Sequence, residues 1–138
     1  MNTFGILPES IRKECLRQMF DCAGPKGMLI IGCWHQDSLR TGFEDFYGKN
    51  PQLCGPCKEE DFDFEKGNFN CSSSGYTSHW WSAQELKDIL EGSFPGKIED
   101  LNIDFKVEGV GIFAICTIKS NWKIAPSMKI YLDGQQTI

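Results

Sequence analysis

The sequence has no apolar run near the ~20 residues that a membrane-spanning helix requires. Its N-terminus is polar and contains Pro8, where a secretory signal would need an uninterrupted apolar stretch. Because of these two absences, we expect neither a membrane protein nor a secreted protein. The sequence therefore predicts a soluble, cytoplasmic protein.

An excess of positive charge is also missing. The chain has 14 basic and 19 acidic residues, for a net charge of -5. Proteins that bind a phosphate backbone or an anionic bilayer use clustered basic residues, so this balance offers no electrostatic attraction to either. We expect no nucleic-acid partner and no membrane partner.

An even set of cysteines, as expected for a disulfide framework, is absent, because the chain has seven. Four of them, Cys15, Cys22, Cys33 and Cys116, stand in apolar stretches and are expected to be buried thiols. The sequence thus favours a reducing compartment over a disulfide-stabilised scaffold.

The first regular pattern predicts a helix over residues 8–22, with Pro8 at the first helical position. One face is formed by Ile11, Cys15, Met19 and Cys22, with Leu16 and Phe20 beside it. Residues 27–34 follow as a continuous apolar run. Such a run is typical of a strand covered on both faces in a parallel sheet. A helix followed by a buried strand indicates an α/β protein.

The pattern weakens over residues 37–78. Phe43, Phe46 and Tyr47 suggest a short helix, and the remainder is rich in turn signals such as Asn50-Pro51 and Gly55-Pro56. We expect a loop-rich insertion over 37–78, either a functional lid or a partly disordered segment, within one domain that spans 1–138.

Regular structure returns at Ser82, which forms a capping box with Glu85 and opens a helix that ends near Gly92. Ile103, Phe105 and Val107 then alternate with polar residues, which predicts a strand with one wet face. Glycines 109 and 111 allow a reversal into the apolar run 112–118. The chain should close with an antiparallel hairpin.

Three segments and their order resemble a known family. They are Phe4-Gly5-Ile6-Leu7-Pro8, the run from Ala23-Gly24-Pro25-Lys26-Gly27 into Met28-Leu29-Ile30-Ile31, and His79-Trp80-Trp81-Ser82 leading into Glu85-Leu86. Together with the final hairpin, they resemble the second half of S-adenosylmethionine-dependent methyltransferases of the class I, Rossmann-like fold. The resemblance covers residues 4–119.

This resemblance implies an α/β fold: a partial Rossmann-like methyltransferase sheet with flanking helices and a C-terminal antiparallel hairpin. It also implies S-adenosylmethionine as cofactor and a small-molecule methyl acceptor. The family's glycine-rich cofactor turn and its ribose-binding acidic residue belong to strands that would precede Met1. We therefore expect the strand at 28–34 to pair with a second copy or with a missing N-terminal half.

The resemblance places Phe4, Gly5 and Ile6 next to the cofactor's methyl group. It places Trp34 and His35 at the carboxyl end of a sheet strand, where α/β proteins bind ligands. His35 is the candidate catalytic base. The alternative is a surface histidine with no catalytic task.

Two further groups are candidates for binding. Tyr76, His79, Trp80 and Trp81 form an aromatic and polar cluster suited to a substrate pocket, unless the tryptophans only cover the sheet. Cys54 and Cys57 have the spacing of a zinc-binding pair, and Cys71 with His79 would complete a tetrahedral set, although that second half has poor spacing.

The leading hypothesis is methyl transfer to a small acceptor, with this chain supplying the substrate-side half. One alternative is a noncatalytic interaction module derived from such a half. The other is a binding domain stabilised by zinc.

Overall fold

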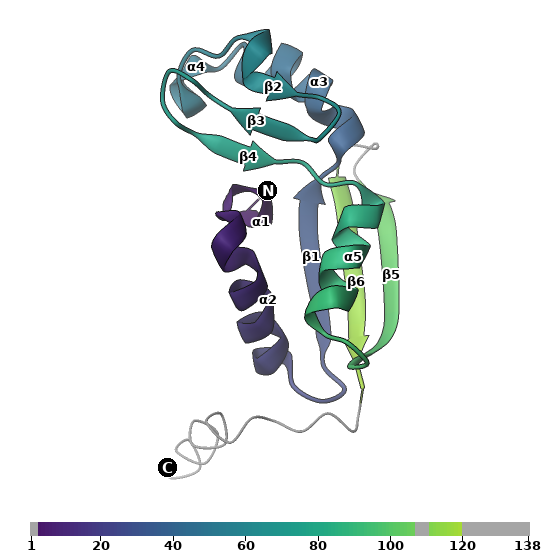
Figure 1. The fold of residues 1–138 in the computed structure, drawn as a ribbon. Helices are drawn as coiled ribbons and strands as arrows, with labels where there is room; N and C mark the ends of the chain where they lie inside the picture. The colour runs from purple at the N-terminus through teal and green to yellow at the C-terminus, as the bar shows by residue number, and fades with distance from the viewer. Residues whose placement is uncertain (1–2, 107–110, 120–138) are drawn as a thin grey trace, which may run out of the picture.

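A computed structural model of the chain describes residues 3–106 and 111–119. Figure 1 shows a larger sheet flanked by long helices and a smaller lobe beyond one end of that sheet. The larger part contains α1 (Thr3–Ile6), α2 (Glu9–Ala23), β1 (Met28–Trp34), α5 (Ala83–Ser93), β5 (Ile98–Lys106) and β6 (Gly111–Ile118). The smaller lobe contains the 3-10 turns η1 (Gln36–Ser38) and η3 (Glu59–Asp61), α3 (Leu39–Thr41), the π-helix η2 (Gly42–Tyr47), α4 (Pro51–Cys54), β2 (Phe62–Asp63), β3 (Asn68–Asn70) and β4 (Thr77–His79).

The larger sheet has the strand order β1-β6-β5, and β6 is antiparallel to both neighbours. Ile31 lies opposite Ala114, which in turn lies opposite Ile103. Because side chains alternate along a strand, these positions and those two residues away share one face. This face packs against α2 and α5 to form the main core.

The final hairpin and the capped helix are confirmed. β5 pairs antiparallel with β6, and β5 begins earlier than the alternation suggested, at Ile98. Val107 and Gly109 lie outside the described residues. Ser82 Oγ accepts a hydrogen bond from the Glu85 amide, and the Glu85 carboxylate accepts one from the Ser82 amide. These bonds satisfy two amides that the first turn of α5 leaves unpaired.

The first helix is confirmed, but the side predicted to be buried is wrong. Leu16 and Phe20, one turn apart, point into the core, and Phe20 stacks on Phe94 of α5 at 4.0 Å between ring centroids. Ile11 and Met19 are exposed. The apolar residues of this helix form two adjacent stripes, and only contact with the sheet selects one of them.

The cysteine prediction is confirmed for half of its members. Cys33 and Cys116 are buried on the core face of the sheet, whereas Cys15 is half-buried and Cys22 is exposed. Both of the latter lie on α2, away from the stripe of Leu16 and Phe20.

The expectation that β1 is covered on both faces in a mainly parallel sheet is wrong for the described residues. Leu29, Ile31 and Cys33 are buried, but Met28 is 59% and Ile30 55% exposed. All strand pairings within the two described sheets are antiparallel. The run of β1 is continuously apolar because its second face is apolar too, although no described element covers that face.

Residues 37–78 contain more regular structure than predicted. The short helix at Phe43–Tyr47 is confirmed as η2, and β2, β3 and β4 form a three-stranded antiparallel sheet. This lobe has its own core, centred on Leu39, Tyr47, Phe62, Phe69 and Trp80. Its strands are two or three residues long, which is too short to show the alternation of apolar and polar residues that predicts a strand.

The chain is thus a mixed α/β protein, as predicted in general terms. Within the described ranges, no helix combines the length and the apolar character needed to cross a bilayer.

Replacing Leu16 with Ala should lower the free energy of unfolding by about 2–5 kcal/mol, because it leaves a cavity under the sheet. Ile11→Ala on the same helix should change it by less than about 0.5 kcal/mol, since Ile11 is exposed. Urea denaturation followed by circular dichroism measures both. Equal effects would contradict the assignment of the buried stripe.

Candidate functional site

A pocket of about 530 Å³ lies at the end of β1, between the larger sheet's helices and the smaller lobe. Three elements contribute most of its wall: the first turn of α2, the first turn of α5, and the β2–β4 sheet with the turn between β2 and β3. The lining residues are Glu9, Arg12, Lys13, Gln36, Glu65, Lys66, Asn68, His79, Trp81, Glu85 and Ile89.

The wall of the pocket is charged but balanced. It has three basic residues, Arg12, Lys13 and Lys66, and three acidic residues, Glu9, Glu65 and Glu85. A ligand of one sign therefore gains no net attraction from the lining, whereas a ligand with charges of both signs can match it.

His79 stands at the end of β4 and is largely buried in the pocket wall. Its Nδ1 lies 2.8 Å from Asn68 Oδ1, and its Nε2 lies 3.6 Å from Glu85 Oε1. Burial lowers the pKa of His79, and the charge of Arg12 lowers it further, while Glu85 and Glu9 act in the opposite direction. A neutral imidazole next to a carboxylate can accept a proton from a bound ligand.

Arg12 is held over the floor of the pocket by the chain that precedes it. Its Nε donates to the Leu7 carbonyl at 2.9 Å and its Nη2 to the Gly5 carbonyl at 3.3 Å. The guanidinium carbon lies 5.1 Å from the ring centroid of Trp81, within range of a cation–π interaction. Burial lowers the pKa of Arg12, and the nearby Glu9 and Glu85 charges oppose that effect.

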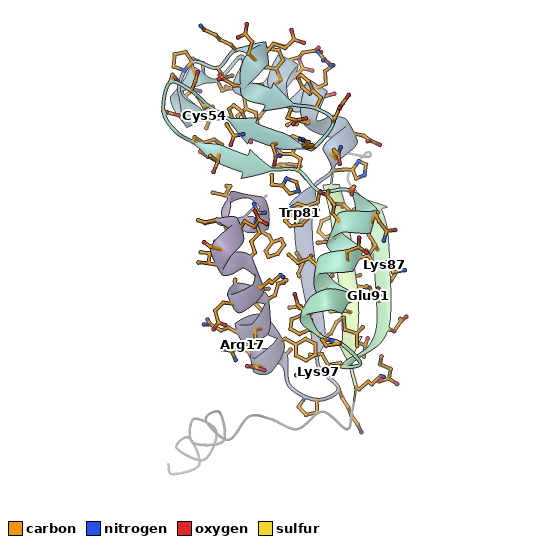
Figure 2. The ribbon with its side chains drawn as sticks, viewed as in Figure 1. Arg17, Cys54, Trp81, Lys87, Glu91 and Lys97 are labelled. Carbon is orange, nitrogen blue, oxygen red and sulfur yellow. The ribbon has the colours of Figure 1, made fainter. Side chains whose placement is uncertain are left out.

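Trp81 forms the floor on which these groups meet. Its ring stacks on Phe4 at 5.0 Å and receives the edge of His79 at 4.6 Å. Its backbone amide donates to the Trp34 carbonyl, and its carbonyl accepts from the Gln36 amide. Figure 2 shows Trp81 between the two parts of the molecule, beside the first turn of α5.

His35, the predicted base, lies outside the lining of this pocket. It is buried, and its Nδ1 accepts a hydrogen bond from the Asp37 amide at 3.3 Å. This bond caps the 3-10 turn η1. The side chain thus has a local structural role at the end of β1.

The predicted cofactor residues lie beneath the pocket. Phe4 is buried under Trp81, the Gly5 carbonyl holds Arg12, and Ile6 is exposed. Phe4 and Gly5 thus position the floor and the cation.

The predicted substrate residues separate into three places. His79 lines the pocket just described. Trp34 and Trp80 stack at 5.6 Å and line a second, mainly apolar cavity of about 250 Å³ next to η2. Tyr76 packs against Tyr47 and Phe69 in the core of the smaller lobe.

The cysteines proposed to bind zinc are not joined by His79. Burial and the neighbouring thiols of Cys57 and Cys71 raise the pKa of Cys54 to about 11. Residues 3–106 and 111–119 contain no group of three or more His, Cys, Asp or Glu side chains placed to hold a metal ion.

Sequence reasoning missed Arg12, Asn68 and the contact of Glu85 with His79. Glu9, Arg12 and Lys13 share a polar face in the first turn of α2, at the predicted ligand-binding end of the sheet. That polar face was a signal in the sequence from which this part of the pocket wall could have been predicted. The position of Asn68 depends on the pairing of β3 with β4, which the sequence did not reveal.

Comparison of the chain with protein-family models, curated proteins and solved structures gave no match.

Removal of a positive charge near His79 and removal of a negative charge should shift the pKa of His79 in opposite directions. Arg12→Met should raise the pKa of His79, because a nearby positive charge disfavours the imidazolium, and Glu85→Gln should lower it. An NMR titration of the imidazole protons measures both shifts. Arg17→Met, on the exposed part of α2, is the matched control and should leave the titration unchanged. Shifts of the same sign in the first two variants would contradict the described electrostatics.

Proposed function

We propose that this chain supplies the acceptor-binding half of an S-adenosylmethionine-dependent methyltransferase for a small molecule. The observation that carries the proposal is the charged pocket at the carboxyl end of β1, bordered by α2 and α5. In mainly parallel α/β sheets, ligands bind at the carboxyl ends of the strands, and the two strands of like direction here, β1 and β5, both end at this edge. The chemistry offered there, a cation, a proton acceptor and an aromatic floor, suits a small polar acceptor.

The order of elements supports the partial Rossmann-like interpretation. Helix α2, strand β1, the smaller lobe, the capped helix α5 and the hairpin β5–β6 follow one another as the resemblance predicts. β1 and β5 are both antiparallel to β6, so they run in the same direction, and α5 lies on the connection between them. Such a connection between strands of like direction is the basic unit of α/β folds.

The described residues fit the acceptor better than the cofactor. The pocket lining has no glycine-rich turn between a strand and a helix, the feature that holds a nucleotide's phosphate or an equivalent nucleoside group. S-adenosylmethionine would supply an electrophilic methyl group. We propose that a second chain or an additional segment contributes to holding it, and that this chain binds and orients the acceptor.

The proposal predicts a heat of binding when S-adenosylmethionine is titrated into the chain at millimolar concentration. Gly5→Val should weaken this binding, because Gly5 is expected to lie next to the cofactor's methyl group. Gly92→Val is the control, since a Cβ at Gly92 meets no atom within 4 Å. Calorimetry measures all three proteins. No heat with the unchanged chain would favour the interaction module instead.

A specific observation supports that second candidate, an interaction module. Met28 and Ile30 of β1 are exposed, and Ile115 and Phe113 lie opposite Ile30 and Gly32 on the same face. β1 is also an edge strand of the described sheet. An exposed apolar strand edge invites pairing with another chain.

This surface predicts self-association through β1. Sedimentation velocity should detect a dimer or larger species whose fraction rises with protein concentration. Ile30→Asp should shift the protein toward monomer, because it places a charge in the apolar face. Leu53→Asp, at an equally exposed apolar residue of α4, should not. A monomer at all concentrations would contradict the predicted pairing between copies.

A further inference from the structure

One pole of the pocket is a partly desolvated cation. Arg12 uses Nε and Nη2 on the carbonyls of Leu7 and Gly5, and among the described residues Nη1 has no recorded hydrogen bond. A guanidinium that has lost part of its hydration is stabilised by a carboxylate, which accepts its N–H groups with good geometry. The two backbone bonds fix the cation in advance, so binding an anion there requires little ordering of the side chain.

The opposite pole combines an imidazole and a carboxylate. Asn68 Oδ1 can only accept a hydrogen bond, so its 2.8 Å contact places the imidazole proton on Nδ1 of a neutral His79. His79 Nε2 and Glu85 Oε1 are then two acceptors 3.6 Å apart. An ammonium group has three donors and can satisfy both of them.

The two poles belong to one pocket and interact electrostatically. Arg12 and Glu85 both influence the proton affinity of His79. We propose that the pocket binds a small zwitterion, with its ammonium group at His79 and Glu85 and its carboxylate at Arg12. The role of this ligand as methyl acceptor rests on the proposed function, whereas its binding does not.

The arrangement also provides the proton transfer that an amine acceptor needs. An ammonium nitrogen has no lone pair and cannot act as a nucleophile. Transfer of one proton to His79 Nε2 breaks an N–H bond of the ligand, leaves its electron pair on the amine nitrogen, and forms the imidazolium. Glu85 stabilises that imidazolium, because it lies 3.6 Å away.

The experiment compares zwitterions with their single-charge analogues. Alanine, β-alanine and 4-aminobutyrate are titrated separately into the full chain without S-adenosylmethionine, and propionate and propylamine serve as the analogues. The imidazole resonances of His79 and the indole resonance of Trp81 report binding. At least one amino acid should bind about tenfold more tightly than either analogue, because each pole adds a charge-assisted hydrogen bond.

Two variants test the assignment of the poles. In Arg12→Gln, the best amino acid should bind no more tightly than propylamine. The Glu85→Gln variant keeps a side chain that can complete the capping box. In this variant, the affinity of the best amino acid should fall toward that of propionate. Arg17→Gln and Glu91→Gln make the same charge changes on the same helices, farther along them from Trp81, and should leave binding unchanged (Figure 2).

The outcomes separate this inference from the proposed function. Preferential binding of an amino acid, lost in both pole variants, supports the inference even when S-adenosylmethionine gives no heat. If S-adenosylmethionine binds but the amino acids bind no better than their analogues, the zwitterion inference is overturned and the methyltransferase proposal stands. Equal losses in the pole variants and in their controls would overturn the inference as well.

Discussion

The structure depends on a short backbone connection between the end of β1 and the segment that follows β4. The Trp81 amide donates to the Trp34 carbonyl at 2.9 Å, and the Gln36 amide donates to the Trp81 carbonyl at 3.0 Å. These bonds join the larger sheet to the smaller lobe. They also fix the position of Trp81, whose ring contacts Phe4, His79 and Arg12. The floor of the pocket therefore depends on this junction.

The electrostatics of the pocket follow from the same placement. His79 is buried against Trp81, and the Arg12 guanidinium lies over the same ring system. Burial disfavours the charged form of each, and the two carboxylates Glu9 and Glu85 oppose that effect on both. The pocket therefore contains a neutral imidazole and a guanidinium that keeps its charge. A ligand with an acidic and a basic end requires this combination.

The sequence predicted the elements whose signals are local. The capping box at Ser82 and Glu85 located α5, and the alternation over residues 103–108 located the first strand of the hairpin. It failed where the outcome depends on distant partners. The apolar residues of α2 allowed two faces, and only the sheet selects Leu16 and Phe20. The run Met28–Trp34 looked fully buried because its uncovered face is as apolar as its covered one. For the site, His79 lines the pocket, and its role in substrate binding stays a prediction. His35 was predicted as the base because the sequence does not reveal that its Nδ1 accepts a hydrogen bond from the Asp37 amide.

Adjacent tryptophans serve the two halves of the molecule separately. Trp80 is packed in the core of the smaller lobe, and Trp81 in the core of the larger sheet. Neighbouring residues in an extended segment face opposite directions, so this dipeptide anchors both hydrophobic cores through one peptide bond. Insertion or deletion of a single residue here would send each indole to the wrong core. The smaller lobe can therefore vary in length at its outer turns during evolution, but its return to the larger sheet must keep this spacing.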